Sequence, residues 1–429
     1  MASDTKRLVI DSGVLANSQR EFSKAFGDQP TVIVSDSNTI AIARAVIDSF
    51  RNAGRSSIKP FVFSDRELYA EHGWVVQLQE SLGQHTAIPI AVGSGTINDL
   101  TKLAAHRVGR PYMCVATAAS MDGYTAFGAS ITVDGSKQTF DCPAPRAVLA
   151  DLDIIANAPD GMNAWGYADL MAKLTCGADW IIADELGVEP INRPAWRMVQ
   201  ERLLEWLGQP EKIKRGDRDA VKGLVCGLMM SGFAMQSMSS SRPASGAEHQ
   251  FSHLWDMQHA TDASHGEKVG VATVAVAKLY EALMKQPIEQ LDIEMLVSKW
   301  PAIDVVERQI DELFSDEPAI NQKAKLETRI KHPSPLQLRQ QLHLLRERWP
   351  SLKSRISKHL PSSCQLVQML KDAGAPTRPE QIGVSPQRLR ESVIRAYQIR
   401  RRFTMLDLAV RAGVLESCVA GLEDHDADR

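Results

Sequence analysis

The chain has 429 residues, of which 44% are hydrophobic and 24% are charged, as is typical of soluble globular proteins. This length predicts two or three domains, and the composition excludes intrinsic disorder and fibrous structure. Lys and Arg total 49 and Asp and Glu total 52, so the net charge of −3 gives no basic footprint for nucleic-acid binding. The expected partner is therefore a small molecule and not a nucleic acid.

Neither export nor membrane insertion is predicted. The first 22 residues mix charges with short apolar runs and lack the apolar block of a secretory signal. The most apolar window, Leu224 to Met238, is interrupted by glycine and polar residues, so it predicts a buried helix and not a membrane span. The six cysteines are scattered without a C-x-x-C pair, which is typical of reduced thiols in a cytoplasmic protein.

The first 150 residues alternate short β-branched runs with helical patterns. Strands are expected at Thr31–Ser35, Pro60–Phe63 and Ile88–Val92, and helices at Ile40–Phe50 and Trp74–Leu82. Continuous apolar strands between helices predict a parallel sheet covered on both faces, and hence an α/β nucleotide-binding-like layer. Alternation in Ser130–Phe140 around Asp134-Gly135 predicts a β-hairpin.

Strand signals almost vanish after Asp141–Pro145 and the turn Ala158–Gly161, and long amphipathic stretches continue to the C-terminus. We therefore expect an α/β domain over residues 1–160 and a helical domain over residues 161–429. The basic run Arg400–Arg402 beside Arg395 is interpreted as the solvated face of a helix that also carries Phe403, Leu406 and Leu408.

The segment Ala91–Leu100 (AVGSGTINDL) combines a strand, a glycine-rich turn and a helix start. Glycines remove side chains from the approach to the turn, and the first helical turn offers N–H groups and a positive dipole end to a phosphate. An ordinary βα turn with Thr96 as the N-cap is an equally good interpretation. The standard dinucleotide fingerprint G-x-G-x-x-G is absent.

A second polar segment, Thr117–Gly123 (TAASMDG), follows the expected strand Tyr112–Ala116. Ligands of open α/β sheets collect at the carboxyl ends of strands, so this segment is a candidate neighbour of the first. The alternative is a capped turn in which Ser120 or Asp122 bonds to local backbone.

Histidines cluster in the helical half, where His249, His253 and His265 fall within 17 residues. The i, i+4 spacing of His249 and His253 can place two imidazoles on one metal, and His265 and a distant carboxylate such as Asp169 could complete the shell. Spacing alone proposes both His249 and His253 as ligands. The alternatives are structural histidines and an Asp169–Lys173 pair along one helix.

Five segments together resemble the sn-glycerol-1-phosphate dehydrogenase family, within the iron-containing alcohol dehydrogenases, glycerol dehydrogenases and dehydroquinate synthases. In chain order they are GSGTINDLTK, TAASMDGYTAFGAS, GYADLMAKL, SSRPASGAEHQFSHLWDM and SHGEKVGVA. The resemblance implies a dehydroquinate synthase-like fold: an α/β NAD(P)-binding domain, an all-α C-terminal domain, and an active site in the cleft between them.

The resemblance also assigns roles to matching positions. The residues expected to contact NAD or NADP are Gly93, Ser94, Gly95, Thr96, Ile97, Asp99, Thr117, Ala118, Ala119 and Ser120. It implies that Asp169, His249 and His265 hold one divalent metal, and that Asp122, Asp169 and His253 contact the substrate. His253 thereby moves from metal ligand to substrate contact, as a candidate proton relay, and Asp122 could orient the terminal hydroxyl.

Other assignments stay open in the sequence. Family members often carry Ser where this chain has Ala126, so a hydrogen bond to the cofactor is either missing or supplied by Thr125. Asp36 could contact a ribose hydroxyl or cap a helix. Arg242 is the first candidate for the substrate phosphate, and its alternative is a loop arginine in water. The metal could be zinc, nickel or iron.

The resemblance implies an enzyme of phospholipid metabolism that reversibly reduces dihydroxyacetone phosphate to sn-glycerol 1-phosphate with NADH or NADPH. Relatives commonly form homodimers or larger homo-oligomers, so we expect a homo-oligomer such as a homodimer, in the cytoplasm. One alternative is another polyol dehydrogenase, such as a glycerol dehydrogenase. A second is a carbocycle-forming lyase related to dehydroquinate synthase. A third is a degenerate member that binds nucleotide or metal as a regulator.

Overall fold

The computed structural model describes residues 3–65, 68–133, 136–159 and 161–422. Contacts group the chain into two compact units. The first contains Met1–Leu170, Pro194–Ser241 and Asp372–Ala375, and the second contains Met171–Arg193, Arg242–Lys371 and Pro376–Arg429. The functional division expected at residue 160 stays a prediction.

The first unit is built on a six-stranded parallel sheet with the strand order β1-β8-β5-β4-β2-β3. Its strands are β1 (Arg7–Asp11), β2 (Thr31–Asp36), β3 (Ile58–Phe63), β4 (Ile88–Gly93), β5 (Met113–Ala116) and β8 (Ala147–Asp151). Strands β2, β4, β5 and β8 are buried along their whole length, as a sheet covered on both faces requires. The expected parallel α/β layer is therefore confirmed.

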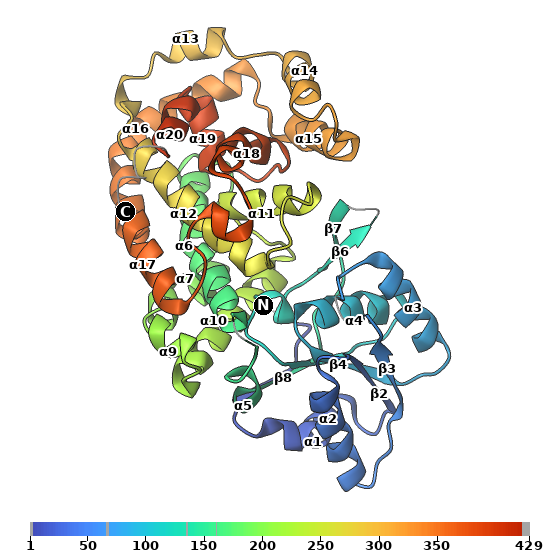
Figure 1. Ribbon diagram of the computed structural model, residues 1–429. Helices are drawn as coiled ribbons and strands as arrows, with labels where there is room; N and C mark the ends of the chain where they lie inside the picture. Colours follow the sequence, from blue (N-terminus) through green and yellow to red (C-terminus); the bar gives the residue numbers. More distant parts are fainter. Residues whose placement is uncertain (1–2, 66–67, 134–135, 160, 423–429) are drawn as a thin grey trace. The chain divides into compact units, whose positions relative to one another are not determined.

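Helices cover both faces of this sheet (Figure 1). Helices α1 (Ser18–Phe26) and α2 (Ile40–Asn52) lie on one face, and α3 (His72–Gly83) and α4 (Gly95–Arg107) lie on the other. Phe22 and Phe50 from the first pair pack with Ile33, Ile90 and Val115 of the strands into one apolar core. The expected hairpin is also present as antiparallel β6 (Ala129–Val133) and β7 (Ser136–Phe140), although its turn, Asp134-Gly135, lies outside the described residues.

Helix α10 (Arg218–Met238) is the long helix of the first unit. It starts at the N-cap Asp217, whose side chain accepts a hydrogen bond from the N–H of Ala220, and it contains the buried helix predicted over Leu224–Met238. It packs against the short helices α5, α8 and α9 and against strand β1. The helices between β8 and α10 are α5 (Leu152–Ile155), α6 (Met162–Glu185), α7 (Arg193–Gln200), α8 (Leu203–Trp206) and α9 (Pro210–Lys214).

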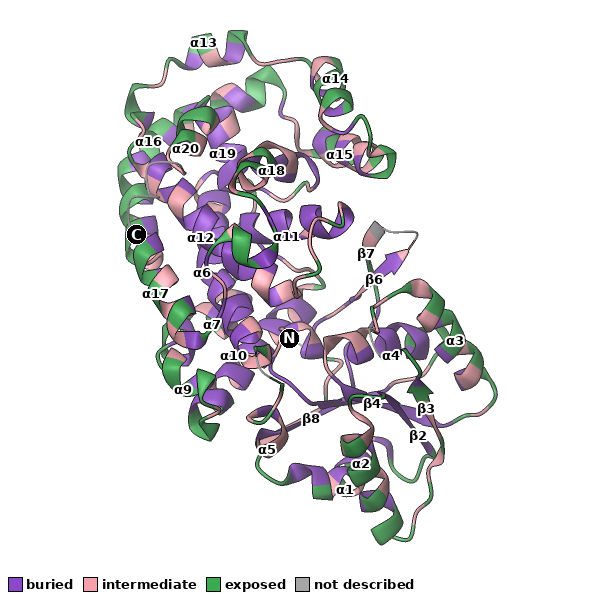
Figure 2. Cartoon of the chain, in the orientation of Figure 1, coloured by how far each residue is buried: buried purple, intermediate pink, exposed green. Residues whose placement is uncertain are grey.

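The second unit is helical. Its helices after α6 are α11 (Ala247–Met257), α12 (His265–Met284), α13 (Ile293–Ser298), α14 (Ile303–Leu313), α15 (Pro318–Lys331), α16 (Pro335–His359), α17 (Ser363–Ala373), α18 (Pro386–Gln398), α19 (Met405–Arg411) and α20 (Leu415–Ala420). Helix α11 packs against α12 and α18, and α11 and α12 are mostly buried (Figure 2). Over the part of the chain that the structure describes, no helix is both long and apolar enough to cross a bilayer.

Candidate active site and metal centre

The glycine-rich turn lies where β4 passes into α4. Strand β4 ends at Gly93, Ser94 is the N-cap, and no side chain caps the first turn of α4. The N-cap expected at Thr96 is therefore wrong, because the helix starts one residue before Thr96. A Cβ atom at Gly93 would lie 2.5 Å from Cγ1 of Ile97, so the close turn requires glycine there. Backbone N–H groups at an uncapped helix start fit the pyrophosphate of a dinucleotide.

Two residues of α4 tie this helix to the loop after β5 and to strand β6, which follows that loop. Asp99 accepts a hydrogen bond from the N–H of Ser130 at 3.1 Å. Lys102 is buried, and its ammonium group donates to the carbonyl oxygens of Gly123, Ala126 and Gly128 at 3.0, 3.1 and 2.9 Å. Sequence reasoning missed Lys102. Its signal was a lysine one turn after Asp99 on a helix that begins in a glycine-rich turn.

The segment Thr117–Ser120 follows β5 beside the glycine-rich turn. The N–H of Thr117 bonds to the carbonyl of Gly93 at 3.2 Å, and β4 and β5 pair directly at Gly93 and Ala116. The structure thus brings together the two segments expected to contact the cofactor.

Asp122 is held from two directions. Its N–H donates to Oδ2 of Asp169 at 3.0 Å, and its own Oδ2 accepts from the hydroxyl of Ser231 at 2.7 Å. The hydroxyl of buried Thr125 donates to the carbonyl of Met229 at 2.7 Å. Thr125 therefore fastens the loop to α10, and this bond favours a missing cofactor contact at Ala126 over its replacement by Thr125.

Asp36 ends β2 and makes a local turn. Its Oδ1 accepts from the N–H of Thr39 at 2.8 Å and from the Thr39 hydroxyl at 2.7 Å. The N-cap of α2 is Thr39, so Asp36 makes a turn before the helix and the helix-capping alternative is wrong. The contact of Asp36 with a ribose stays a prediction.

The candidate metal centre consists of one carboxylate and two imidazoles. Among the described residues, ligand atoms of Asp169, His249 and His265 all lie within 4.8 Å of one another. The ring of His253 lies on the same helix as His249, with centroids 6.2 Å apart, but His253 is not in this group. Three N and O donors at this spacing fit a divalent metal with an open coordination position.

Glu248 supports the ring of His249. Nδ1 of His249 lies 2.8 Å from Oε1 of Glu248, and the buried carboxylate also accepts from the N–H of Gly246 at 2.6 Å and the Thr175 hydroxyl at 2.8 Å. A proton on Nδ1 would leave Nε2 of His249 as the metal-facing atom. Burial raises the pKa of Glu248, and these hydrogen bonds oppose that rise.

We expect Glu248→Ala to weaken metal binding about 10- to 100-fold, since partners of metal-bound histidines have effects of this size. A chelator competition titration with Zn²⁺ measures the affinity directly. Glu281→Gln is the matched control, because Glu281 also accepts two hydrogen bonds, from Ser363, and lies later on α12. Equal zinc affinity in Glu248→Ala and the unmodified protein would contradict the assignment.

Beneath Glu248 lies a second buried carboxylate, Asp179. It accepts hydrogen bonds from the N–H groups of Ala247 at 2.7 Å and Met405 at 2.8 Å, and from the hydroxyl of Tyr280 at 2.6 Å. Burial, and then the charge of Glu248, raise the pKa of Asp179 to about 7. Asp179 and Glu248 therefore cap the start of α11 and fix the position of His249.

Arg242 is fully buried, so it is not a loop arginine in water. Its guanidinium donates to the carbonyls of Phe403 at 2.9 Å and Asp179 at 3.1 Å, and it lies 3.2 Å from Glu189. These contacts fasten the loop before α11 to the segment before α19. Phosphate binding by Arg242 stays a prediction.

The interpretation of Arg400–Arg402 as a solvated helix face is wrong. These residues lie between α18 and α19, and only Arg401 is exposed, with its guanidinium on Glu327 at 2.8 Å. Arg400 and Arg402 are half-buried and reach back to Ser245, just before α11. Periodicity alone could not distinguish a helix from this connecting segment.

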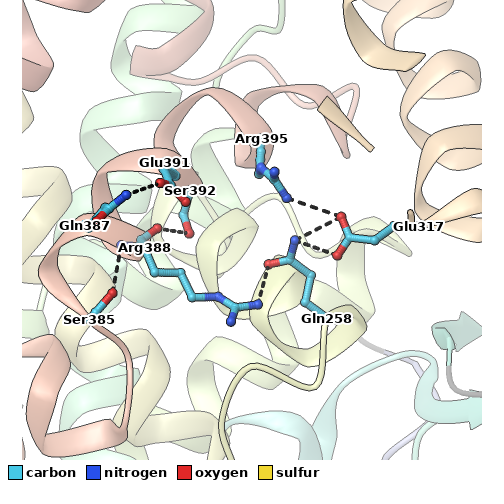
Figure 3. A pocket seen from close by; sticks show the side chains of 8 residues that line it. All are labelled: Gln258, Glu317, Ser385, Gln387, Arg388, Glu391, Ser392 and Arg395. Carbon is cyan, nitrogen blue, oxygen red and sulfur yellow. Dashed lines mark hydrogen bonds and ion pairs between the residues drawn. The ribbon is translucent and has the colours of Figure 1, made fainter. Parts of the chain in front are cut away.

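A cavity of about 350 Å³ lies in the helical unit, and Figure 3 shows the side chains that line it. It is lined by Gln258, Glu317, Ser385, Gln387, Arg388, Glu391, Ser392 and Arg395. Arg395 contacts Glu317 at 3.3 Å, and Gln258 bonds to the same carboxylate. The cavity is lined by none of the predicted site residues, so it is not the candidate active site.

Sequence comparisons bear on this site. Residues 9–159 match the model of the family described as iron-containing alcohol dehydrogenase. A protein of Geobacillus stearothermophilus named glycerol-1-phosphate dehydrogenase [NAD(P)+] is 30% identical over 382 residues, which cover 87% of this chain and 85% of the relative. A protein of the same name from Halalkalibacterium halodurans is 35% identical over 265 residues, 60% of this chain and 66% of the relative.

Solved structures share the fold. A probable glycerol dehydrogenase from Sinorhizobium meliloti 1021 has a TM-score of 0.65 at 12% identity, covering 98% of both chains. Glycerol dehydrogenase from Schizosaccharomyces pombe has a TM-score of 0.64 at 16% identity, covering 100% of this chain and 93% of that one. These likenesses confirm the expected architecture of an α/β part followed by a helical part.

Proposed function

Because this chain belongs to the glycerol-1-phosphate dehydrogenase family, we propose that it reversibly reduces dihydroxyacetone phosphate to sn-glycerol 1-phosphate. The observation that carries this proposal is the group of Asp169, His249 and His265, whose ligand atoms lie within 4.8 Å of one another. When bound, a divalent metal supplies polarisation of the substrate carbonyl and a nicotinamide supplies the hydride.

Side chains of the protein would bind the metal, transfer a proton and orient the substrate. Asp169, His249 and His265 would hold the metal. His253 would hold and release a proton at its imidazole, which titrates near neutrality. Asp122, kept in place by Ser231 at 2.7 Å, would orient the terminal hydroxyl of the substrate.

The cofactor would lie across the carboxyl ends of β4 and β5. Its pyrophosphate would meet the N–H groups of Gly95, Thr96 and Ile97, and Thr117–Ser120 would line the same cofactor. The relatives' names include both NAD and NADP, and we propose that this chain uses one or both. A cytoplasmic location and a homodimer are further proposals; the six unpaired cysteines support the first, and sedimentation velocity tests the second.

We expect metal-stripped protein to be inactive and a single restored ion, Zn²⁺, Ni²⁺ or Fe²⁺, to recover reduction of dihydroxyacetone phosphate. Initial rates with dihydroxyacetone phosphate, dihydroxyacetone and glycerol, each with NADH/NAD⁺ and NADPH/NADP⁺, measure the preference. Highest kcat/KM for the unphosphorylated compounds would instead identify a glycerol dehydrogenase. Turnover of a phosphorylated sugar without net NADH consumption would identify a lyase, because such a lyase recycles its NAD.

A further inference from the structure

Two cations of the helical unit lie beside α11 without being used by the assignments above. Lys323 belongs to α15 and Arg400 to the segment between α18 and α19. Nη1 of Arg400 lies 3.2 Å from the hydroxyl of Ser245, just before α11 begins. Nζ of Lys323 lies 3.8 Å from the sulfur of Met257, at the end of α11.

These two side chains flank the face of α11 that carries His253. Residues 250, 253 and 257 share one helix face because α-helical neighbours recur every three or four residues. The amide of Gln250 donates to the carbonyl of Arg402 at 3.3 Å, which places the Arg400–Arg402 segment along this face. His253 therefore lies one turn from Gln250 and one turn from Met257, between the two cations along the helix.

Positive charge exceeds negative charge at this position. Glu327 acts electrostatically on both cations and Glu248 acts on Arg400, but Glu327 is already bound by the backbone N–H, Nε and Nη2 of Arg401 at 2.8 Å each, and Glu248 by Gly246 and Thr175. Burial and the charge of Arg400 lower the pKa of Lys323, and burial lowers the pKa of Arg400. Arg402 adds a third cation, with its guanidinium on the carbonyl of Ser245 at 2.7 Å.

Such an arrangement is costly for the protein alone. Half-buried cations that repel one another gain stability when an anion is placed between them. A sulfur atom is a poor partner for an ammonium group, and a serine hydroxyl is a neutral partner for a guanidinium. A phosphate dianion offers three acceptor oxygens and two negative charges, and so it matches a lysine and an arginine together.

We propose that Lys323 and Arg400 bind the phosphate monoester of the substrate beside His253. This proposal rests on the proposed function, because it names the groups that distinguish a phosphorylated triose from its unphosphorylated counterpart. It transfers the role expected of Arg242 to Lys323 and Arg400, which contact a thioether and a hydroxyl, since Arg242 is engaged by Glu189 and two carbonyls.

The test uses the metal-loaded enzyme and the variants Arg400→Gln and Lys323→Met. Each test variant has a matched control on the same segment. Arg401→Gln is the control for Arg400→Gln, because the exposed guanidinium of Arg401 contacts Glu327. Lys325→Met is the control for Lys323→Met, because Lys325 also lies on α15 and its ammonium group pairs with Asp311 at 2.6 Å. We expect each test variant to lower the ratio of kcat/KM for dihydroxyacetone phosphate to kcat/KM for dihydroxyacetone by about 10- to 100-fold, the usual effect of losing a hydrogen bond to a charged group. The controls should keep the wild-type ratio.

A binding measurement separates this proposal from the proposed function. Inorganic phosphate, titrated calorimetrically into the protein, should bind the wild type and both controls and lose at least tenfold in affinity in Arg400→Gln and Lys323→Met. If the wild type does not reduce dihydroxyacetone phosphate but shows this pattern, the proposed function fails and the anion site stands. If turnover is present while ratios and phosphate affinity match the controls, the phosphate site is wrong and the proposed function stands.

Discussion

Replacing His249 by alanine should strip the metal from the purified protein and lower kcat/KM for dihydroxyacetone phosphate by about 10³-fold or more. Polarisation by a metal is worth several kcal/mol in the transition state, and each 1.36 kcal/mol is about a factor of ten in rate. His249 supplies one of the three donors, and Glu248 at 2.8 Å fixes its ring. Mass-spectrometric metal content and initial rates, measured on the same sample, test both parts.

His253→Ala is the matched comparison, because His253 lies one turn further along the same helix. It should keep the metal at wild-type content and still slow turnover, since His253 is assigned to proton transfer and not to the metal. The metal assignment fails if His249→Ala retains one tightly bound equivalent of metal and full turnover. The assignment of His253 fails if its alanine variant loses the metal instead.

The alternation of apolar runs was enough to predict the centre of the sheet. Strands β2 and β4 are six-residue runs with every residue buried, and the apolar runs Val32–Val34 and Ile88–Val92 within them are distinct from the flanking helices. The apolar runs did not predict β1 or β8, which pair with each other along the whole of β1. Strand β1 is an edge strand with only intermediate burial and charged ends, so its pattern is weak.

At the metal centre, local sequence spacing predicted only part of the ligand set. Local spacing predicted His249 and His253 as metal ligands, because helical spacing can only indicate which residues of the same helix share a face. The structure groups His249 with Asp169 on α6 and His265 at the start of α12, which are relations between helices. The resemblance to a family supplied these relations, since it carries tertiary information that the spacing of residues lacks.

Supporting residues were missed for the same reason. Lys102 and Glu248 carry charges at positions where a helical pattern predicts no special role, and their partners lie in loops or in other helices. Only the fold shows that Lys102 reaches three carbonyls and that Glu248 lies behind His249. Buried charges of this kind persist because their hydrogen bonds are complete, and this is a property of packing and not of local sequence.

Gly166 should be the least replaceable small residue near the cofactor segment. A Cβ atom on Gly166 of α6 would lie 1.7 Å from the carbonyl oxygen of Ala119, and this oxygen belongs to backbone that cannot rotate away. Gly166→Ala must therefore displace Thr117–Ser120 from the end of β5. We expect the free energy of unfolding to fall by about 3 kcal/mol or more, at the upper end for overpacking, and the Kd for NADH to rise about 100-fold.

Gly232 on α10 makes the same kind of contact with the loop that carries Asp122, because its Cβ would lie 2.1 Å from the hydroxyl oxygen of Thr125 and 2.7 Å from the carbonyl oxygen of Asp122. Gly223 is the matched control on that helix, since the nearest atom to its Cβ is 3.9 Å away. Gly223→Ala should leave activity intact and stabilise α10 by about 0.5 to 1 kcal/mol through the helix preference of alanine. Gly232→Ala should therefore lose stability as Gly166→Ala does, and urea unfolding and NADH fluorescence titration measure all three variants. If Gly166→Ala keeps wild-type stability and NADH affinity, the close contact between α6 and Thr117–Ser120 does not support the cofactor segment.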